Sequence, residues 1–267
     1  MEFRDVIYTK EDMIATITMN RPERLNAITE AMITEMVEAV RDVQQDRNIR
    51  VAVLTGAGRG FNSGADVKAV ASAGAEGTER PLAQRRNFLR EDLHRISRAL
   101  LELHKPIIAS VNGPCAGGGM DLASMCDLRI ASEKAIFVMS YINVGLVPSM
   151  GGAYYLQRIV GLPKAAELIW TGKTIDAHEA FRIGYVNQVV PHEQLPAATR
   201  DLAATIAGRP PVAIELGKRL LYRVRDLDAD RALELTEFSQ LITLSTEDSR
   251  EGFRAAAEKR PPVFKGR

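Results

Sequence analysis

Three consecutive glycines, Gly117–Gly119, stand between an apolar run at residues 107–111 and a segment with helical patterning. Because glycine has no Cβ, another molecule can approach the backbone closely at such a point. The first N–H groups of a helix have no acceptor inside the helix, and the helix dipole makes that end positive. A carboxylate, Asp121, follows two residues after the last glycine. The segment therefore predicts a pocket for a developing negative charge with a candidate acid–base group beside it.

Strand and helix patterns alternate along the first 190 residues. Short apolar or alternating runs predict strands at residues 6–8, 13–19, 51–54, 106–111, 126–131 and 186–190. Helical spacing and capping residues predict helices at 29–43, 81–103, 151–160, from 163 onward and at 176–184. Thr29 is the expected N-cap of the first helix, and Asp176 with Glu179 resembles a capping box. The alternation predicts an α/β fold whose strands pair in parallel after a first hairpin.

The C-terminal part has a different pattern. Residues 195–260 read as helical, with a break at Pro210–Pro211 and no strand candidate. The sequence thus predicts a core at residues 1–194 and a helical region at 195–267. Within the core, one face of the helix at 81–103 is expected to be apolar and to carry Leu89, Leu93, Ile96, Leu100 and Leu103.

Composition narrows the classes of protein. The 267 residues, 46% apolar and 26% charged, suit a globular protein with a substantial core. A net charge of +1 gives no electrostatic reason to expect nucleic acid or an anionic membrane as a partner. The two cysteines form no disulfide framework, and no stretch resembles a secretion signal or a membrane span, so a cytoplasmic location is expected. No histidine has metal-ligand spacing to another histidine or a cysteine, so no metal is expected.

An ordered set of motifs along nearly the whole chain resembles the crotonase (enoyl-CoA hydratase/isomerase) superfamily. The motifs are RLNA at 24–27, VLTG at 53–56, FNSGADVK at 61–68, KP at 105–106, VNG at 111–113, GGG at 117–119, CD at 126–127, GLVP at 145–148, TG at 171–172, Ala180 with Gly184, EG at 251–252 and EKR at 258–260. Each motif alone is weak evidence. Their order and spacing together are highly specific.

The resemblance implies a spiral of β-β-α units with a C-terminal helical region that mediates trimerisation, often as a dimer of trimers. It also implies a coenzyme A thioester as substrate, with no permanently bound cofactor. In the family, two backbone N–H groups hold the thioester oxygen, and the matching positions are Ala65 and Gly118. Fixed donors aimed at that oxygen stabilise the enolate that forms during the reaction.

Positions that contact CoA in the family match Arg24, Ala27, Asp66, Lys68 and Lys259. The resemblance implies that Lys68 approaches the CoA phosphates and that Lys259 reaches the CoA of a neighbouring subunit. Arg24 lies in the segment that borders the nucleotide. Long cationic side chains make such contacts to phosphate readily.

The sequence departs from the family at the catalytic carboxylates. Hydratases of the family carry two glutamates that share a water, and these positions are Asp121 and Tyr141 here. Aspartate is shorter by one methylene, or ~1.5 Å. Tyrosine, with an ordinary pKa of about 10, donates a hydrogen bond at neutral pH and is a poor base. Ser149 and Met150 stand where some isomerases place an acidic residue. Asp121 and Tyr141 are therefore the expected catalytic residues, with one carboxylate between them.

Reversible hydration of a 2-enoyl-CoA is the first expectation for the reaction. Enoyl-CoA or dienoyl-CoA double-bond isomerisation is an alternative, as is a lyase, decarboxylase or thioester hydrolase reaction that needs only the oxyanion site. Loss of the second carboxylate suggests an alternative of another class, a non-catalytic acyl-CoA binding subunit. RNA binding is known for one branch of the family, and the near-zero net charge argues against it here.

Overall fold

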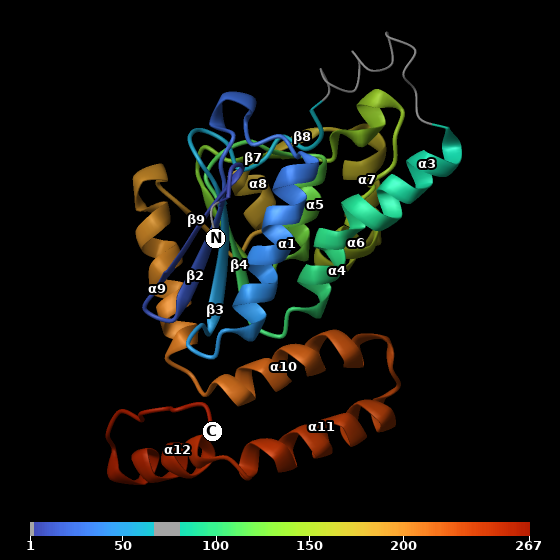
Figure 1. Cartoon of the computed structure of the whole chain (residues 1–267). Coiled ribbons are helices and arrows are strands. Elements are labelled where there is room, and N and C mark those ends of the chain that lie inside the picture. The colour runs from blue at the N-terminus through green and yellow to red at the C-terminus, as the bar shows by residue number, and fades with distance from the viewer. Residues whose placement is uncertain (1–2, 67–80) are drawn as a thin grey trace.

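The computed structural model describes residues 3–66 and 81–267 and shows a large β-sheet enclosed by helices (Figure 1). The strand order of this sheet is β1-β2-β3-β4-β6-β9. Its strands are β1 (Val6–Glu11), β2 (Ile14–Met19), β3 (Val51–Gly56), β4 (Ile107–Val111), β6 (Leu128–Ser132) and β9 (Gln188–Val190). β1 and β2 are antiparallel, and every later pairing in this sheet is parallel. The α/β fold and the parallel pairing after the first hairpin are thus confirmed for the large sheet.

A smaller sheet consists of β5 (Cys115–Ala116), β7 (Ile136–Val138) and β8 (Thr174–Asp176). β5 pairs with β7 in parallel, whereas β7 and β8 are antiparallel. The prediction that all strands after the hairpin pair in parallel is therefore wrong for this sheet. The sequence pattern also missed its strands, because segments of two or three residues are too short to show a period of two.

Side chains of the large sheet alternate between two apolar layers, as the pleat of a strand requires. In β3, Ala52 and Leu54 belong to the core that includes α1 (Glu30–Gln45). The intervening Val51 and Val53 belong to a second core with α9 (Leu195–Ala207). The sheet is therefore covered on both faces, which explains why β3 is a continuous apolar run (Figure 1).

The remaining helical segments connect these layers. They are η1 (Pro22–Arg24), α3 (Leu82–Asn87), η2 (Phe88–Leu93), α4 (His94–Glu102), α5 (Gly118–Met125), η3 (Ser140–Val144), α6 (Gly152–Val160), α7 (Leu162–Thr171), α8 (Ala177–Arg182), η4 (His192–Gln194), α10 (Pro211–Arg223), η5 (Val224–Asp226), α11 (Ala229–Leu244) and α12 (Glu247–Glu258). The helix predicted at 81–103 consists of three segments, of which η2 is a π-helix. Leu93, Ile96, Leu100 and Leu103 are buried, but Leu89, within the π-helix, is 39% exposed. A π turn holds an extra residue, so it changes the face that a preceding side chain occupies.

The C-terminal region contains two kinds of helix. α9 packs on the sheet, whereas α10, α11 and α12 form a layer below it (Figure 1). Arg50 ties this layer to the sheet by donating to the carbonyls of Ala207 and Phe264, both at 2.9 Å. Lys218 on α10 donates to Asp127 at 2.8 Å. Over the described residues, no helix combines the length and the apolar character needed to cross a membrane.

Candidate active site

The glycine segment forms a turn between β5 and α5, as predicted. Gly117 has φ +50°, a left-handed conformation that glycine adopts without strain, and a Cβ there would lie 3.0 Å from Ser140 Oγ. A Cβ on Gly119 would lie 2.1 Å from the carbonyl oxygen of Asn62. These glycines therefore allow the segment at 61–65 to pack directly against the start of α5.

That segment brings Ala65 close to Gly118. Gly64 has φ +81°, and a Cβ built on it would lie 3.0 Å from the amide nitrogen of Gly118. Asn62 Oδ1 fixes this turn by accepting a hydrogen bond from the Gly64 amide at 2.8 Å. Within residues 3–66 and 81–267, neither the Ala65 nor the Gly118 N–H donates to a protein acceptor. Two unpaired amides on adjoining segments fit the pair of oxyanion donors that the resemblance implies.

Asp121 lies in the first turn of α5 and has no exposed surface. Its Oδ2 accepts hydrogen bonds from the Tyr141 hydroxyl at 2.8 Å and from the Met150 amide at 3.0 Å. Its Oδ1 is buried and forms no hydrogen bond of acceptable geometry with the described residues. A Cβ on Gly152 would lie 2.0 Å from Oδ1, so only glycine fits beside the carboxylate.

Burial is the main influence on the acidity of Asp121. Removing the carboxylate from water raises its pKa to about 6, while the donors Tyr141 and Met150 oppose that rise. The nearby Gly152 amide also favours the ionised form, although it is not aligned for a hydrogen bond. Asp121 is thus ionised near neutral pH and remains a stronger base than an exposed aspartate. Such a pKa suits a group that both takes and returns a proton.

Tyr141, on η3, is held between Asp121 and Ser149. It donates to Asp121, and the Ser149 hydroxyl donates to its oxygen at 3.4 Å. Burial, together with the adjacent Asp121 charge, raises the pKa of Tyr141 above its ordinary value. The phenol therefore keeps its proton at neutral pH and acts as a donor that orients Asp121.

The segment with the predicted CoA contacts Arg24 and Ala27 lies beside the residues around Gly64. Ser63 Oγ donates to the Arg24 carbonyl at 3.2 Å, and the Ile28 amide donates to the Gly64 carbonyl at 2.8 Å. Arg24 is exposed at the end of η1, whereas Ala27 is buried. Asp66 directly follows Ala65 and is half-buried.

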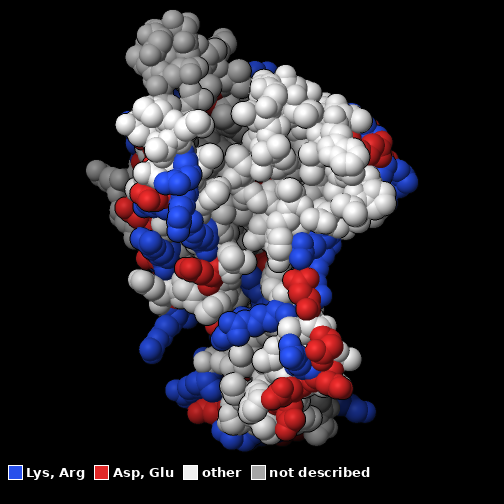
Figure 2. All heavy atoms as spheres, turned by 90° about the vertical axis from the view of Figure 1, so that its right-hand side faces the viewer, with Lys and Arg blue, Asp and Glu red and all other residues white. Residues whose placement is uncertain are grey.

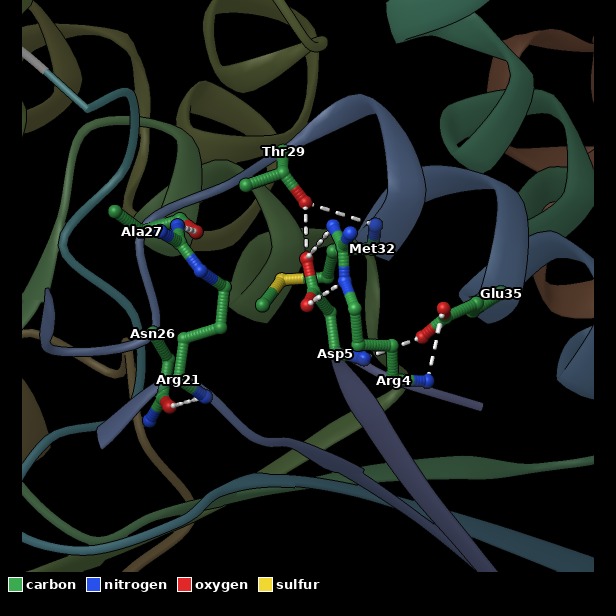
Figure 3. Close-up of polar contacts among 8 residues, drawn as sticks. All are labelled: Arg4, Asp5, Arg21, Asn26, Ala27, Thr29, Met32 and Glu35. Carbon is green, nitrogen blue, oxygen red and sulfur yellow. Dashed lines mark hydrogen bonds and ion pairs between the residues drawn. The ribbon is translucent and has the colours of Figure 1, made fainter. Parts of the chain in front are cut away.

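A polar network at the N-terminus holds this segment in place (Figure 3). Arg21 donates from its backbone to Asn26 Oδ1 at 2.8 Å and from its guanidinium to the Ala27 carbonyl at 2.9 Å. Thr29 donates to Asp5 Oδ2 at 2.6 Å and accepts from the Met32 amide, which confirms it as the N-cap of α1. The chain entering α1 is therefore fixed on both sides of Ala27.

The structure does not bring the two predicted lysines to this place. Lys68 lies outside the described residues. Lys259 is exposed at the end of α12, in the layer below the sheet and away from α5 (Figure 1). Within one chain, Lys259 and Asp121 therefore belong to separate parts of the molecule. In the same described ranges, no group of three or more His, Cys, Asp or Glu side chains could hold a metal ion.

Several groups around Asp121 were not identified from the sequence. The Met150 amide has no side-chain signature, and Gly152 reads only as the start of a helix. His94 and Ser97 contact the carbonyls of Ser149 and Met150, respectively. The one signal in the sequence is their spacing of three residues, which places both on one face of a helix between leucines.

Comparisons with known proteins agree with this geometry. The family model described as enoyl-CoA hydratase/isomerase matches residues 9–267. A Mycobacterium tuberculosis protein named a probable enoyl-CoA hydratase is 43% identical over 258 residues, covering 94% of this chain and 89% of its own. A short-chain-enoyl-CoA hydratase of Clostridium acetobutylicum is 36% identical, with 97% of each chain covered.

A solved structure shows the same architecture. The crystal structure of an enoyl-CoA hydratase from Bacillus anthracis superposes with a TM-score of 0.91 at 30% identity, covering 99% of this chain and 100% of that one. The glycine turn, the unpaired amides and the buried carboxylate thus occur in a chain that matches one family in both sequence and fold. On this evidence the chain belongs to the enoyl-CoA hydratase/isomerase family.

Proposed function

We propose that the protein catalyses the reversible hydration of a 2-enoyl-CoA thioester. One observation carries this proposal: Asp121, buried and with a pKa near neutrality, lies on the same first turn of α5 as the unpaired Gly118 amide. The relatives named enoyl-CoA hydratase support it, since they align with nearly the whole chain.

The residues divide the chemistry between charge stabilisation and proton transfer. The amides of Ala65 and Gly118 donate to the thioester oxygen, which becomes negative when water adds to C3. Ionised Asp121 takes a proton from that water as the C3–O bond forms, and the enolate then collects a proton at C2 from the protonated Asp121. Tyr141 keeps Asp121 oriented in both steps. Losing one oxyanion donor typically costs roughly 3–4 kcal/mol of transition-state stabilisation.

Turnover of crotonyl-CoA in oxygen-18 water tests the proposal. The expected product is a 3-hydroxyacyl-CoA that carries the heavy isotope, identified by mass spectrometry. Asp121→Asn is expected to lower kcat by about 10²- to 10⁴-fold, the usual contribution of a general acid–base group, while CoA binding persists. Unchanged turnover in Asp121→Asn would contradict the catalytic assignment.

Double-bond isomerisation is the second candidate, and the phenol of Tyr141 beside a single carboxylate favours it. One base can remove a proton from C2 of a 3-enoyl-CoA and return it at C4 without any water addition. With a 3-enoyl-CoA as substrate, a shifted double bond with no oxygen-18 incorporation, and no hydration of crotonyl-CoA, would replace hydration by this reaction. A lyase, decarboxylase or hydrolase reaction would release a smaller product, and no turnover on any thioester would indicate a binding subunit.

We also propose how CoA and the subunits are arranged. The segment of Arg24 would border the CoA nucleotide, Lys68 would approach the CoA phosphates, and Ala27 and Asp66 would also contact CoA. Lys259 would contact the CoA of a neighbouring subunit in a homotrimer or a dimer of trimers. The exposed position of Lys259, far from Asp121 of its own chain, supports a contribution across subunits. The two cysteines are free and buried, which suits the reducing cytoplasm.

A further inference from the structure

Helix α4 holds the segment that reaches Asp121. His94 Nε2 lies 2.7 Å from the carbonyl oxygen of Ser149, and Ser97 Oγ donates to the carbonyl oxygen of Met150 at 2.9 Å. A carbonyl oxygen only accepts hydrogen bonds, so His94 Nε2 carries a proton in this contact. This donation persists whether the imidazole is neutral or protonated.

One peptide group, between Ser149 and Met150, links His94 to Asp121. The carbonyl of Ser149 and the N–H of Met150 belong to the same planar unit and point in opposite directions. His94 binds the oxygen of this unit, and Asp121 Oδ2 accepts from its nitrogen at 3.0 Å. A donor on the oxygen also polarises the peptide group, which strengthens the hydrogen bond from its N–H.

The chain on either side of this peptide group is irregular. Gly151 follows at once with φ +115°, and the neighbouring residues Val144, Leu146 and Val147 are exposed. Met150 itself is buried, whereas Ser149, which contributes the carbonyl to this peptide group, is half-buried. Upstream, the π-helix at residues 88–93 ends immediately before His94. Such turns are frequently found at functional sites. The extra residue of this turn determines the side of α4 on which the His94 side chain lies.

We infer that His94 is a positioning residue for the reaction: it orients the Ser149–Met150 peptide group so that its N–H stabilises ionised Asp121. Ser97 assists by holding the next carbonyl. The inference rests on the proposed function only where activity is the readout, because the hydrogen-bonded chain from His94 to Asp121 exists without substrate.

Two substitutions at His94 separate positioning from simple packing. His94→Leu removes the donor, whereas His94→Gln places an amide N–H near the position of Nε2. With crotonyl-CoA, His94→Leu is expected to lower kcat by about 10- to 100-fold with a smaller change in KM, because the Met150 amide, no longer oriented, loses its hydrogen bond to the charged Asp121. It is also expected to raise the apparent pKa on the acidic limb of kcat/KM. His94→Gln is expected to restore both values toward those of the unaltered protein.

Three titratable groups near Asp121 keep their protons over the acidic limb, because burial raises the pKa of each: Tyr141 on η3, Cys115 on β5 and Tyr185 before β9. His94 lies one peptide group away from Asp121, so the carboxyl signal of Asp121, observed directly by NMR, assigns the limb. His178→Leu is the matched control, since His178 is exposed on α8 and has no hydrogen bond within the described residues. It is expected to leave kcat and the pH profile unchanged.

Carbon-13 NMR of the Asp121 carboxyl tests the inference without turnover. In His94→Leu, the Asp121 carboxyl is expected to titrate at higher pH than in the unaltered protein. In His94→Gln, it is expected to titrate close to the unaltered value. Equal titration in all three proteins would overturn the positioning role even if hydration is confirmed. If the enzyme hydrates no enoyl-CoA, a shifted titration would still support the role, and only the proposed function would fail. Equal loss of thermal stability and of kcat in both variants, without a shift, would mean packing alone.

Discussion

The ionised form of Asp121, which catalysis requires, lowers the stability of the folded protein. Its pKa rises from an ordinary 3.8 to about 6 on folding, because the carboxylate is buried. The folded state therefore binds more protons than the unfolded state between these two values, and the free energy of unfolding falls as pH rises through this range. A shift of this size corresponds to about 3 kcal/mol. The folded protein is therefore less stable when Asp121 carries the charge that the reaction needs, because that charge is buried.

Asp121→Asn should reveal this cost. The variant cannot ionise, so its advantage in the free energy of unfolding over the unaltered protein should grow by about 2 kcal/mol between pH 4 and pH 7.5, because part of the full difference is already present at pH 4. Urea denaturation at both pH values measures the difference. A constant difference across this range would show that Asp121 titrates normally in the folded state.

The same pKa sets the pH dependence of turnover. Because Asp121 acts as a base, kcat/KM for the enoyl-CoA should fall about tenfold for each pH unit below about 6 and level off above it. Initial rates across pH 4.5–8 at low substrate concentration measure this limb. A limb near pH 4 would indicate that the carboxylate is solvated before substrate binds.

Gly152 gives a steric test of the same residue. An added Cβ would lie 2.0 Å from Asp121 Oδ1 and 2.9 Å from Met139 Cε, in a fully packed region. Gly152→Ala is therefore expected to destabilise the protein by about 1–3 kcal/mol and to lower kcat by at least about 10²-fold through displacement of the carboxylate. Gly217→Ala on α10 is the control, because a Cβ there meets nothing within 4 Å. It should stabilise the helix by about 0.5–1 kcal/mol.

At the scale of elements, the short helix α5 depends on its C-terminal cap. Arg129 on β6 is buried, and its guanidinium donates to the carbonyls of Tyr185, Cys126 and Ala123 at 2.6, 2.7 and 3.2 Å. Two of these carbonyls end α5, where the helix dipole favours a positive charge. Arg129 therefore fixes the end of the helix whose beginning carries Gly118 and Asp121.

Arg129→Met should expose this dependence. The substitution fills similar space but leaves the buried carbonyls of Tyr185 and Cys126 without a donor, whereas the Ala123 carbonyl keeps the Cys126 amide. A loss of about 2–5 kcal/mol in the free energy of unfolding is therefore expected. Arg129→Lys should recover only part of the loss, since an ammonium group cannot reproduce the planar fork of the guanidinium. Urea denaturation of the two variants compares them. Equal stability of Arg129→Met and the unaltered protein would contradict the capping role.

Elements with long periodic patterns could be predicted from the sequence. The buried run of β3 and the apolar face of α1 behind its Thr29 cap are confirmed. The elements that could not be predicted depend on interactions between segments that are distant in the sequence. The helix predicted at 81–103 contains a π turn, and β5, β7 and β8 exist only through pairing with one another. Asp176 caps α8, but Glu179 pairs with Arg182 instead of completing a capping box.

In the candidate site, too, the local features could be predicted from the sequence and the long-range contacts could not. The glycine turn and Asp121 occupy one short segment, so local chemistry was enough to predict them. His94 and Ser149 are 55 residues apart in sequence, and the group that reaches Asp121 is a backbone amide. No residue type marks such an amide, because any non-proline residue at position 150 would supply it. Contacts of this kind require the folded structure.

At the scale of the whole molecule, two regions expose several large apolar side chains. The face that carries η3, α6 and α7 shows few charged side chains (Figure 2) and exposes Val147, Leu162 and Trp170. The lower layer exposes Leu233, Phe238 and Leu241 on α11. Groups of exposed apolar side chains are common at protein–protein contacts in soluble proteins. Both regions are therefore candidates for contacts between subunits.

Helix α11 makes the strongest case for assembly. It has 16 residues, none of them buried within its own chain, so the core of one subunit does not stabilise it. A helix of this length is marginal in water without packing of its apolar side chains.

In light scattering, the protein should have three or six times the 29.4 kDa mass of one chain. Phe238→Glu combined with Leu241→Glu should give smaller particles, with less helix in circular dichroism. The control is Leu101→Glu, since Leu101 is exposed on α4 outside both regions. A monomer with an intact α11 would exclude the assembly and, with it, any contribution of Lys259 to a neighbouring site.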